Sequence, residues 1–133
     1  MDEPVCTHST RPIPHPGGVF DIDVDFVDHA VSVRTVAGAI ERIPLRPMTV
    51  ASFYSDPMDA MRTAGVPTEI STSPSEVPFT TPFDEDVEHA TYDPEWANRY
   101  WRVLATVDAV MKEHRGRFRG KVRPSTSSGV RLT

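Results

Sequence analysis

The stretch VFDIDVDFVDHAVSVRTVAGAIERIPL, residues 19–45, decides the fold of this 133-residue chain. Apolar and acidic side chains alternate through its first part, from Val19 to Phe26. A period of two residues is typical of a β-strand with one buried side and one side that faces solvent. We therefore expect a strand here, with a solvated acidic face.

Two turn signals divide the rest of this stretch. Asp28 and His29 predict a turn into a second strand over residues 30–36, and Ala37 with Gly38 predicts a turn into a third over residues 39–45. Short turns between consecutive strands indicate an antiparallel meander, in which one sheet face can remain solvated.

A helix is expected after the meander. Thr49 is a suitable N-cap and Gly65 a suitable C-terminal stop, and apolar residues between them recur at spacings of three and four. Pro57 falls inside this helix, where proline removes a backbone donor and costs about 3 kcal/mol. The sequence therefore predicts a kink or two short helices near residues 55–57.

A fourth strand is expected at residues 68–72, followed by a long proline-containing loop to about residue 91. Asp93 and Pro94 then provide an N-cap and a first helical residue. The helix that follows has one broad apolar face, which we expect to cover the buried face of the sheet. Its members are Trp96, Tyr100, Val103, Leu104, Val107 and Met111. The expected fold is α+β: an antiparallel sheet of about four strands with two main helices packed on one face.

The chain is expected to contain one domain. Residues 1–18 are predicted to form an irregular N-terminal segment, residues 19–121 a single α+β domain, and residues 122–133 a disordered tail without apolar periodicity. Thirteen prolines, roughly double the average usage of about 5%, indicate long irregular connections.

Composition narrows the possible partners and the compartment. The net charge is −5, and residues 1–111 hold 18 acidic against 7 basic residues, which argues against a nucleic-acid partner. Cys6 is the single cysteine, so an intramolecular disulfide is impossible. The acidic start lacks the features of a signal peptide, and no apolar run approaches the ~20 residues of a membrane span. We expect a cytoplasmic protein with no membrane partner.

Ionisable residues gather in one loop just before the last predicted helix. The candidate binding residues are Asp84, Asp86, His89 and Tyr92. Three interpretations remain open for them: a metal or acid–base site, polar contacts to a ligand or partner, and loop solvation with helix capping. A metal site would need further ligands, which only the fold could bring close; the candidates are His8, His15, His29 and Glu76.

Two other binding motifs lack residues that they require. Asp21, Asp23 and Asp25 resemble the start of a calcium loop, but Phe26 stands where glycine is required and Ser32 where glutamate is required. Gly17 and Gly18 are too few for a phosphate-binding loop. We expect no bound cofactor and no metal.

Several motifs, read together, resemble a bacterial family of uncharacterised proteins, the domain of unknown function 5996. They occur in order between about Pro12 and Lys121. The motifs are PIP at residues 12–14, FDIDVDFVDH at 20–29, PLRP at 44–47, VASFY at 50–54, EVP at 76–78, PFDED at 82–86, HATYDPE at 89–95 and RFRGK at 117–121. The resemblance implies no established activity, cofactor or site residue.

The chain departs from the family pattern at three places. The segment before the first strand is short, Asp56 and Pro57 replace apolar helix residues, and the family segment Ser-Pro-Val-His-Phe-Phe-Trp-Gly is missing after Lys121. The codons GTT CGC CCG TCC ACT TCT TCT GGG GT would encode residues 122–130, and the same letters in another frame encode that missing segment. We therefore expect residues 122–133 to be an out-of-frame tail and the protein to be truncated at its N-terminus, which sequencing of the gene would test.

These observations favour a binding or interaction module for an unknown small molecule or protein, which in this shortened form could be non-functional. The alternative is a small metal-dependent or acid–base hydrolase that uses Asp84, Asp86 and His89. Whether the protein is an enzyme stays open. An exposed sheet edge would also allow homo-oligomers to form.

Overall fold

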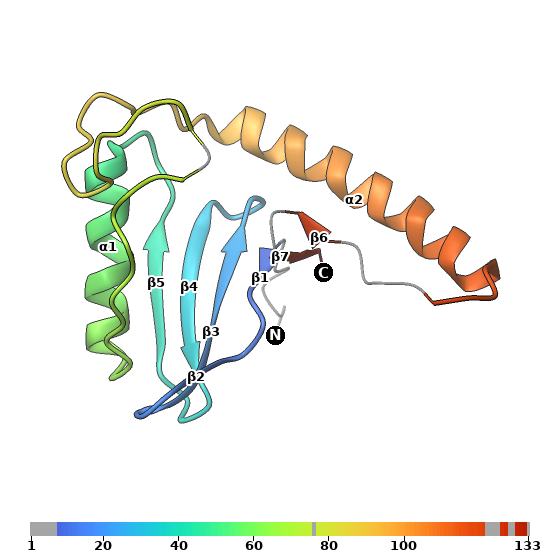
Figure 1. Ribbon diagram of the computed structural model, residues 1–133, viewed down its shortest axis with the longest axis horizontal. Helices are drawn as coiled ribbons and strands as arrows, with labels where there is room; N and C mark the ends of the chain where they lie inside the picture. The colour runs from blue at the N-terminus through green and yellow to red at the C-terminus, as the bar shows by residue number, and fades with distance from the viewer. Residues whose placement is uncertain (1–7, 76, 122–125, 128–129, 133) are drawn as a thin grey trace.

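The computed structural model describes residues 8–75, 77–121, 126–127 and 130–132 (Figure 1). It confirms an α+β fold with an antiparallel sheet and two helices, α1 (Val50–Thr63) and α2 (Pro94–Arg117). The strands within these residues are β1 (His8–Ser9), β2 (Ile13–His15), β3 (Gly18–Asp25), β4 (Ala30–Thr35), β5 (Ile40–Pro44), β6 (Thr126–Ser127) and β7 (Val130–Leu132).

The strand β3 is the centre of the sheet. The strand order is β5-β4-β3-β1-β7-β6, and β2 also pairs with β3. The pairings are antiparallel, with Ile22 opposite Val33 and Val33 opposite Glu41. The predicted meander of residues 19–45 is therefore the part of the sheet formed by β3, β4 and β5.

Short strands occur in both terminal segments, where the sequence predicted none. In the segment 1–18, β1 pairs with β3 through His8 opposite Val24, and β2 pairs through Ile13 opposite Phe20. In the segment 122–133, β6 and β7 pair with each other, and β7 also pairs with β1. Residues 122–125, 128–129 and 133 lie outside the described residues, and the out-of-frame origin of the tail stays a prediction.

Residues 68–72 do not form the predicted fourth strand. The hydroxyl of Thr68 donates to the carbonyl of Val66 at 3.0 Å, and Ile70 lines a cavity against α1. Ile70, the apolar residue of this segment, lies on the helix side of the sheet, and the segment does not extend the sheet edge.

The hydrophobic core lies between the sheet and α1. Its buried members are Phe20, Val31, Val33, Ile43, Ala60, Met61 and Val66. Phe20, Val31 and Val33 come from the predicted strands, and Ala60 and Met61 from the inner face of α1. The apolar face predicted from the two-residue period of the strands thus packs against the apolar face predicted from the 3.6-residue period of the helix.

The helix α1 continues through Pro57 instead of dividing into two helices. Thr49 caps it, since its Oγ1 accepts from the Ser52 backbone N–H at 3.2 Å. The ring of Pro57 lines the apolar space above the sheet, where it adds packing surface. This packing offsets part of the cost of the missing backbone donor.

The helix α2 starts where expected but does not cover the sheet. The Asp93 carboxylate accepts from the backbone N–H groups of Glu95 and Trp96 at 2.9 and 3.1 Å. Figure 1 shows the helix running past the ends of the strands instead of across their face. Trp96 and Tyr100 remain 66% and 58% exposed. The prediction that they pack on the sheet was wrong, because α1 and side chains that include Val66, Ile70 and Phe83 already pack on that side.

The acidic side of β3 is not simply solvated, as the sequence suggested. Asp23 and Asp25 are buried. Asp23 pairs with Arg34 and accepts a hydrogen bond from the Ser9 hydroxyl, and Asp25 accepts from the backbone N–H groups of Val27 and Asp28. Buried carboxylates are tolerated here because each has charged or backbone donors.

Two valines near each other in the chain provide a test of this core. Val33 is fully buried and Val36 is 82% exposed. We expect Val33→Ala to lower the free energy of unfolding by about 2–3 kcal/mol, because it removes buried methyl groups and leaves a cavity. Val36→Ala should change it by less than about 0.5 kcal/mol. Urea unfolding of the two variants measures the difference, and equal losses would contradict this core.

Candidate functional site

Asp86 is the organising residue of the loop that the sequence singled out. Its side chain is buried, with 2% exposure. Its Oδ1 accepts from the backbone N–H groups of Glu88 at 3.2 Å and His89 at 3.0 Å. A carboxylate that accepts from its own loop in this way fixes the turn that follows it.

The same loop caps α1. The backbone N–H groups of Val50 and Ala51 donate to the carbonyl oxygens of His89 and Asp86, at 3.0 and 2.9 Å. These two donors belong to the first turn of the helix, where no intrahelical acceptor exists. Sequence reasoning considered this loop only as a cap for the helix that follows it. No local signal links the loop to a helix that begins about 35 residues earlier in the chain.

His89 forms a side-chain pair with Asp86. Its Nδ1 donates to Asp86 Oδ2 at 2.8 Å, and its ring stacks on Phe79 with 4.4 Å between centroids. The pKa of Asp86 is lowered, first by the hydrogen bond from the His89 backbone; burial opposes this shift, and the His89 side chain and the Glu88 backbone add to it. The pair orients the imidazole and leaves its side chain 42% exposed.

The other two candidate residues lie apart from the Asp86–His89 pair. Asp84 is exposed on the turn before it. The Tyr92 hydroxyl shares a 2.8 Å hydrogen bond with His29 Nδ1, and burial raises the pKa of Tyr92. His89 and Tyr92 do line one space of about 460 Å³ together with Arg46, which we call the loop cavity.

The proposed supplementary metal ligands do not assemble around this loop. Among the described residues there is no group of three or more His, Cys, Asp or Glu side chains suited to a metal ion. His15 bonds the carbonyl of Pro67 at 2.8 Å, His8 packs against Phe26, and His29 is engaged with Tyr92. Glu76 lies outside the described residues.

A larger apolar space was missed by sequence reasoning. It has a volume of about 590 Å³ and lies between β3 and α1; we call it the sheet–helix cavity. Phe20, Ile22 and Val24 form its floor, and α1 contributes residues between Val50 and Met61. Phe83 and Ile70 close part of the opposite side. The alternating pattern predicted this apolar face but could not reveal that it is incompletely covered.

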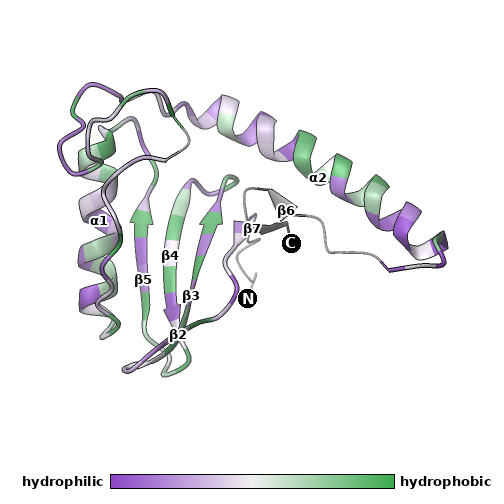
Figure 2. Ribbon diagram, in the orientation of Figure 1, coloured by the Kyte–Doolittle hydropathy of each residue, from purple (hydrophilic) through white to green (hydrophobic). Residues whose placement is uncertain are grey.

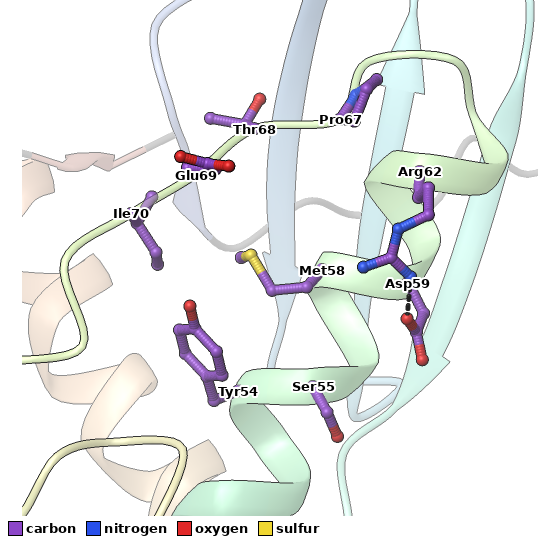
Figure 3. Close-up of a pocket in the computed structure, with 9 residues that line it drawn as sticks. All are labelled: Tyr54, Ser55, Met58, Asp59, Arg62, Pro67, Thr68, Glu69 and Ile70. Atoms are coloured by element: carbon purple, nitrogen blue, oxygen red, sulfur yellow. Dashed lines mark hydrogen bonds and ion pairs between the residues drawn. The ribbon is translucent and has the colours of Figure 1, made fainter.

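The sheet–helix cavity opens toward a polar rim. The neighbouring space, the rim cavity, shares Tyr54, Met58, Thr68 and Ile70 with it. Figure 3 shows Tyr54 and Met58 pointing from α1 toward the segment that carries Ile70. Apart from Pro67, the rest of the rim is polar or charged, with Asp59 paired to Arg62. Its further members are Ser55, Pro67 and Glu69. The arrangement is an apolar chamber with a polar mouth.

The lowered pKa of Asp86 predicts how stability depends on pH. A carboxyl whose pKa falls on folding stabilises the fold above its ordinary pKa of 3.8, and this stabilisation is lost as the pH falls through the lowered value. We expect the Tm of the native chain to drop steeply below about pH 4. Asp86→Asn should have a lower Tm at pH 7 and a shallower drop in acid.

Asp84→Asn is the matched control, because Asp84 is exposed on the same loop. Its Tm should follow that of the native chain at each pH. Thermal unfolding by circular dichroism between pH 3 and 7 measures the three curves. Parallel curves for Asp86→Asn and the native chain would show that this carboxylate does not stabilise the fold.

Comparison with known proteins identifies the family. Neither helix within the described part of the chain has the length and apolar character that crossing a bilayer requires. No curated protein and no solved structure matches the chain. The model of the family described as "Family of unknown function (DUF5996)" matches residues 6–127, which is most of the chain. The chain therefore belongs to this family of unknown function.

Proposed function

We propose that this domain binds a neutral, amphipathic small molecule in the sheet–helix cavity. The observation that carries the proposal is the cavity itself, whose volume of about 590 Å³ lies within the usual range of ligand pockets. Apart from Tyr54 and Thr68, its lining residues are aliphatic, Phe, Pro or Met. Water gains few hydrogen bonds in such a space, so an apolar ligand that displaces it gains free energy.

The rim supports an amphipathic ligand over a purely apolar one. The hydroxyls of Tyr54 and Thr68 stand where the sheet–helix cavity and the rim cavity meet. The Tyr54 hydroxyl can donate to or accept from a hydroxyl or amide on the ligand, and the Thr68 hydroxyl, which already donates to the Val66 carbonyl, can accept. The apolar part of the molecule would lie against β3, and its polar group would lie at the rim.

The charges of the rim disfavour an anionic ligand. Arg62 is the single cation among the rim residues and already pairs with Asp59. Glu69 adds a second carboxylate. An anion there would meet a net negative charge and would have to compete with Asp59 for the guanidinium. A neutral polar group avoids both costs.

Acid–base hydrolysis at the loop is the second candidate, favoured by the 2.8 Å pair of Asp86 and His89. In hydrolases, a carboxylate that accepts a hydrogen bond from an imidazole orients that imidazole as a general base. The hydroxyl groups that line the loop cavity with His89 belong to Thr91 and Tyr92. Burial raises the pKa of Tyr92 and makes it a poor nucleophile at neutral pH. Binding therefore has the stronger support.

A pair of isoleucines tests the binding proposal. Ile70 lines both the sheet–helix cavity and the rim cavity, whereas Ile40 on β5 is 65% exposed and lines neither. The neutral probe N-phenyl-1-naphthylamine should bind the native chain, and Ile70→Trp should weaken binding at least about tenfold by filling the mouth. Ile40→Trp should leave the affinity unchanged.

Titration calorimetry measures the three dissociation constants. Circular dichroism confirms that both variants keep the native secondary structure. Equal affinities for Ile70→Trp and Ile40→Trp, or no binding to the native chain, would rule out this cavity as the site.

A further inference from the structure

An exposed apolar seam runs along α2. Trp96, Tyr100, Val103, Val107 and Val110 follow one another at spacings of four, three, four and three residues. Each of these side chains is more than half exposed. This spacing is the 3.5-residue period of a coiled-coil seam. We refer to these five residues as the α2 seam; apolar residues along this helix appear as green bands in Figure 2.

The α2 seam is exposed, on a different side of the helix from the one that contacts the domain. The half-buried and buried residues of the helix follow a different line, which includes Ala97, Trp101, Leu104 and Asp108. On the same side, the Asn98 side chain donates to the Phe26 carbonyl at 2.9 Å. The helix thus uses one side to attach to its own domain and presents the seam on another.

We propose that the α2 seam is the interface with a second copy of this chain, paired as an antiparallel two-helix coiled coil. An antiparallel pair stacks Val107 on Val103 of the second copy and Tyr100 on Val110. The axis of twofold symmetry then crosses the helix pair at the level of residue 105, next to Thr106. Every residue of the seam except Trp96 thereby meets another seam residue, and Trp96 lies opposite His114.

The charges beside the seam favour this arrangement. Arg99 and Glu113 flank it on the same side, each one residue before a seam-line position. In the antiparallel pair, Arg99 of each copy lies opposite Glu113 of the other, which gives two opposite-charge contacts. Within one copy these residues pair with Glu95 and Arg117. Each flanking charge can join a wider network across the interface.

The charges at the two ends of α2 also select the direction. Its last part, residues 112–117, is basic, because Lys112, Arg115 and Arg117 outnumber Glu113. At its start, residues 93–102, Asp93 and Glu95 balance Arg99 and Arg102. An antiparallel pair brings the basic end of each helix to the balanced start of the other, where Glu95 lies. A parallel pair would place the two basic ends together, where like charges repel.

The available area is consistent with a dimer of modest affinity. The helix has 24 residues and is therefore about 36 Å long. Two aromatic side chains and three valines, each more than half exposed, offer on the order of 500 Å² on each copy. Two copies together approach the ~1,200 Å² of the smallest specific interfaces. We expect a dissociation constant in the micromolar range.

Sedimentation velocity of the full chain tests the interface. The native chain should dimerise between about 1 and 100 µM, and Val107→Asp should raise the dissociation constant at least tenfold. Ala109→Asp is the matched control, since it adds the same charge to an exposed position on the same helix outside the seam. It should dimerise like the native chain, and circular dichroism should show equal helix content in both variants.

Two further sets of variants, one with cysteines and one with exchanged charges, test the antiparallel direction. Thr106→Cys in a Cys6→Ser background should form a disulfide-linked dimer under mild oxidation, and Ala109→Cys in that background should not. Arg99→Glu and Glu113→Arg should each weaken the dimer, and the double variant should recover most of the lost affinity. A monomeric native chain overturns the proposal, as does a dimer that is insensitive to Val107→Asp and is therefore joined elsewhere, for example at the edge of β5.

Discussion

The apolar face of β3 is the surface that the rest of the structure must cover. Phe20, Ile22 and Val24 point to one side of the sheet, and their exposure to water would be costly. The helix α1 covers the part nearest β4 and β5, and the side chains of Val66, Ile70 and Phe83 cover another part. Together they leave part of this face uncovered. The helix α2 does not cover the remainder, because it runs past the ends of the strands. The sheet–helix cavity lies over the part of the face that these segments leave uncovered.

The loop at residues 84–92 joins the parts that provide this cover. Its buried carboxylate shapes the turn, and its carbonyl groups satisfy the first donors of α1. Tyr92 then ties the end of the loop to His29 in the turn between β3 and β4. One short segment therefore fixes the start of α1, the wall of a cavity and the point where α2 begins.

Local patterns predicted much of this fold, and non-local contacts account for what they missed. Alternation identified β3, turn signals separated β4 and β5 from it, and Thr49 and Asp93 identified both helix starts, because these signals act over a few residues. The direction of α2 depends on contacts such as that between Asn98 and the Phe26 carbonyl, 72 residues apart in the chain. The candidate loop was found by its composition, yet the capping role of Asp86 required the position of α1. The cavity needed the packing of three separate segments, which no window of sequence contains.

The contact between this loop and α1 also makes two amide hydrogens into reporters of local opening. The N–H groups of Val50 and Ala51 donate to loop carbonyls and not to their own helix. Solvent can exchange these hydrogens only when the loop separates from the helix, since fraying of later turns leaves the two bonds intact. Their exchange rates would therefore report separation of the loop wall from α1, independently of global unfolding of the sheet.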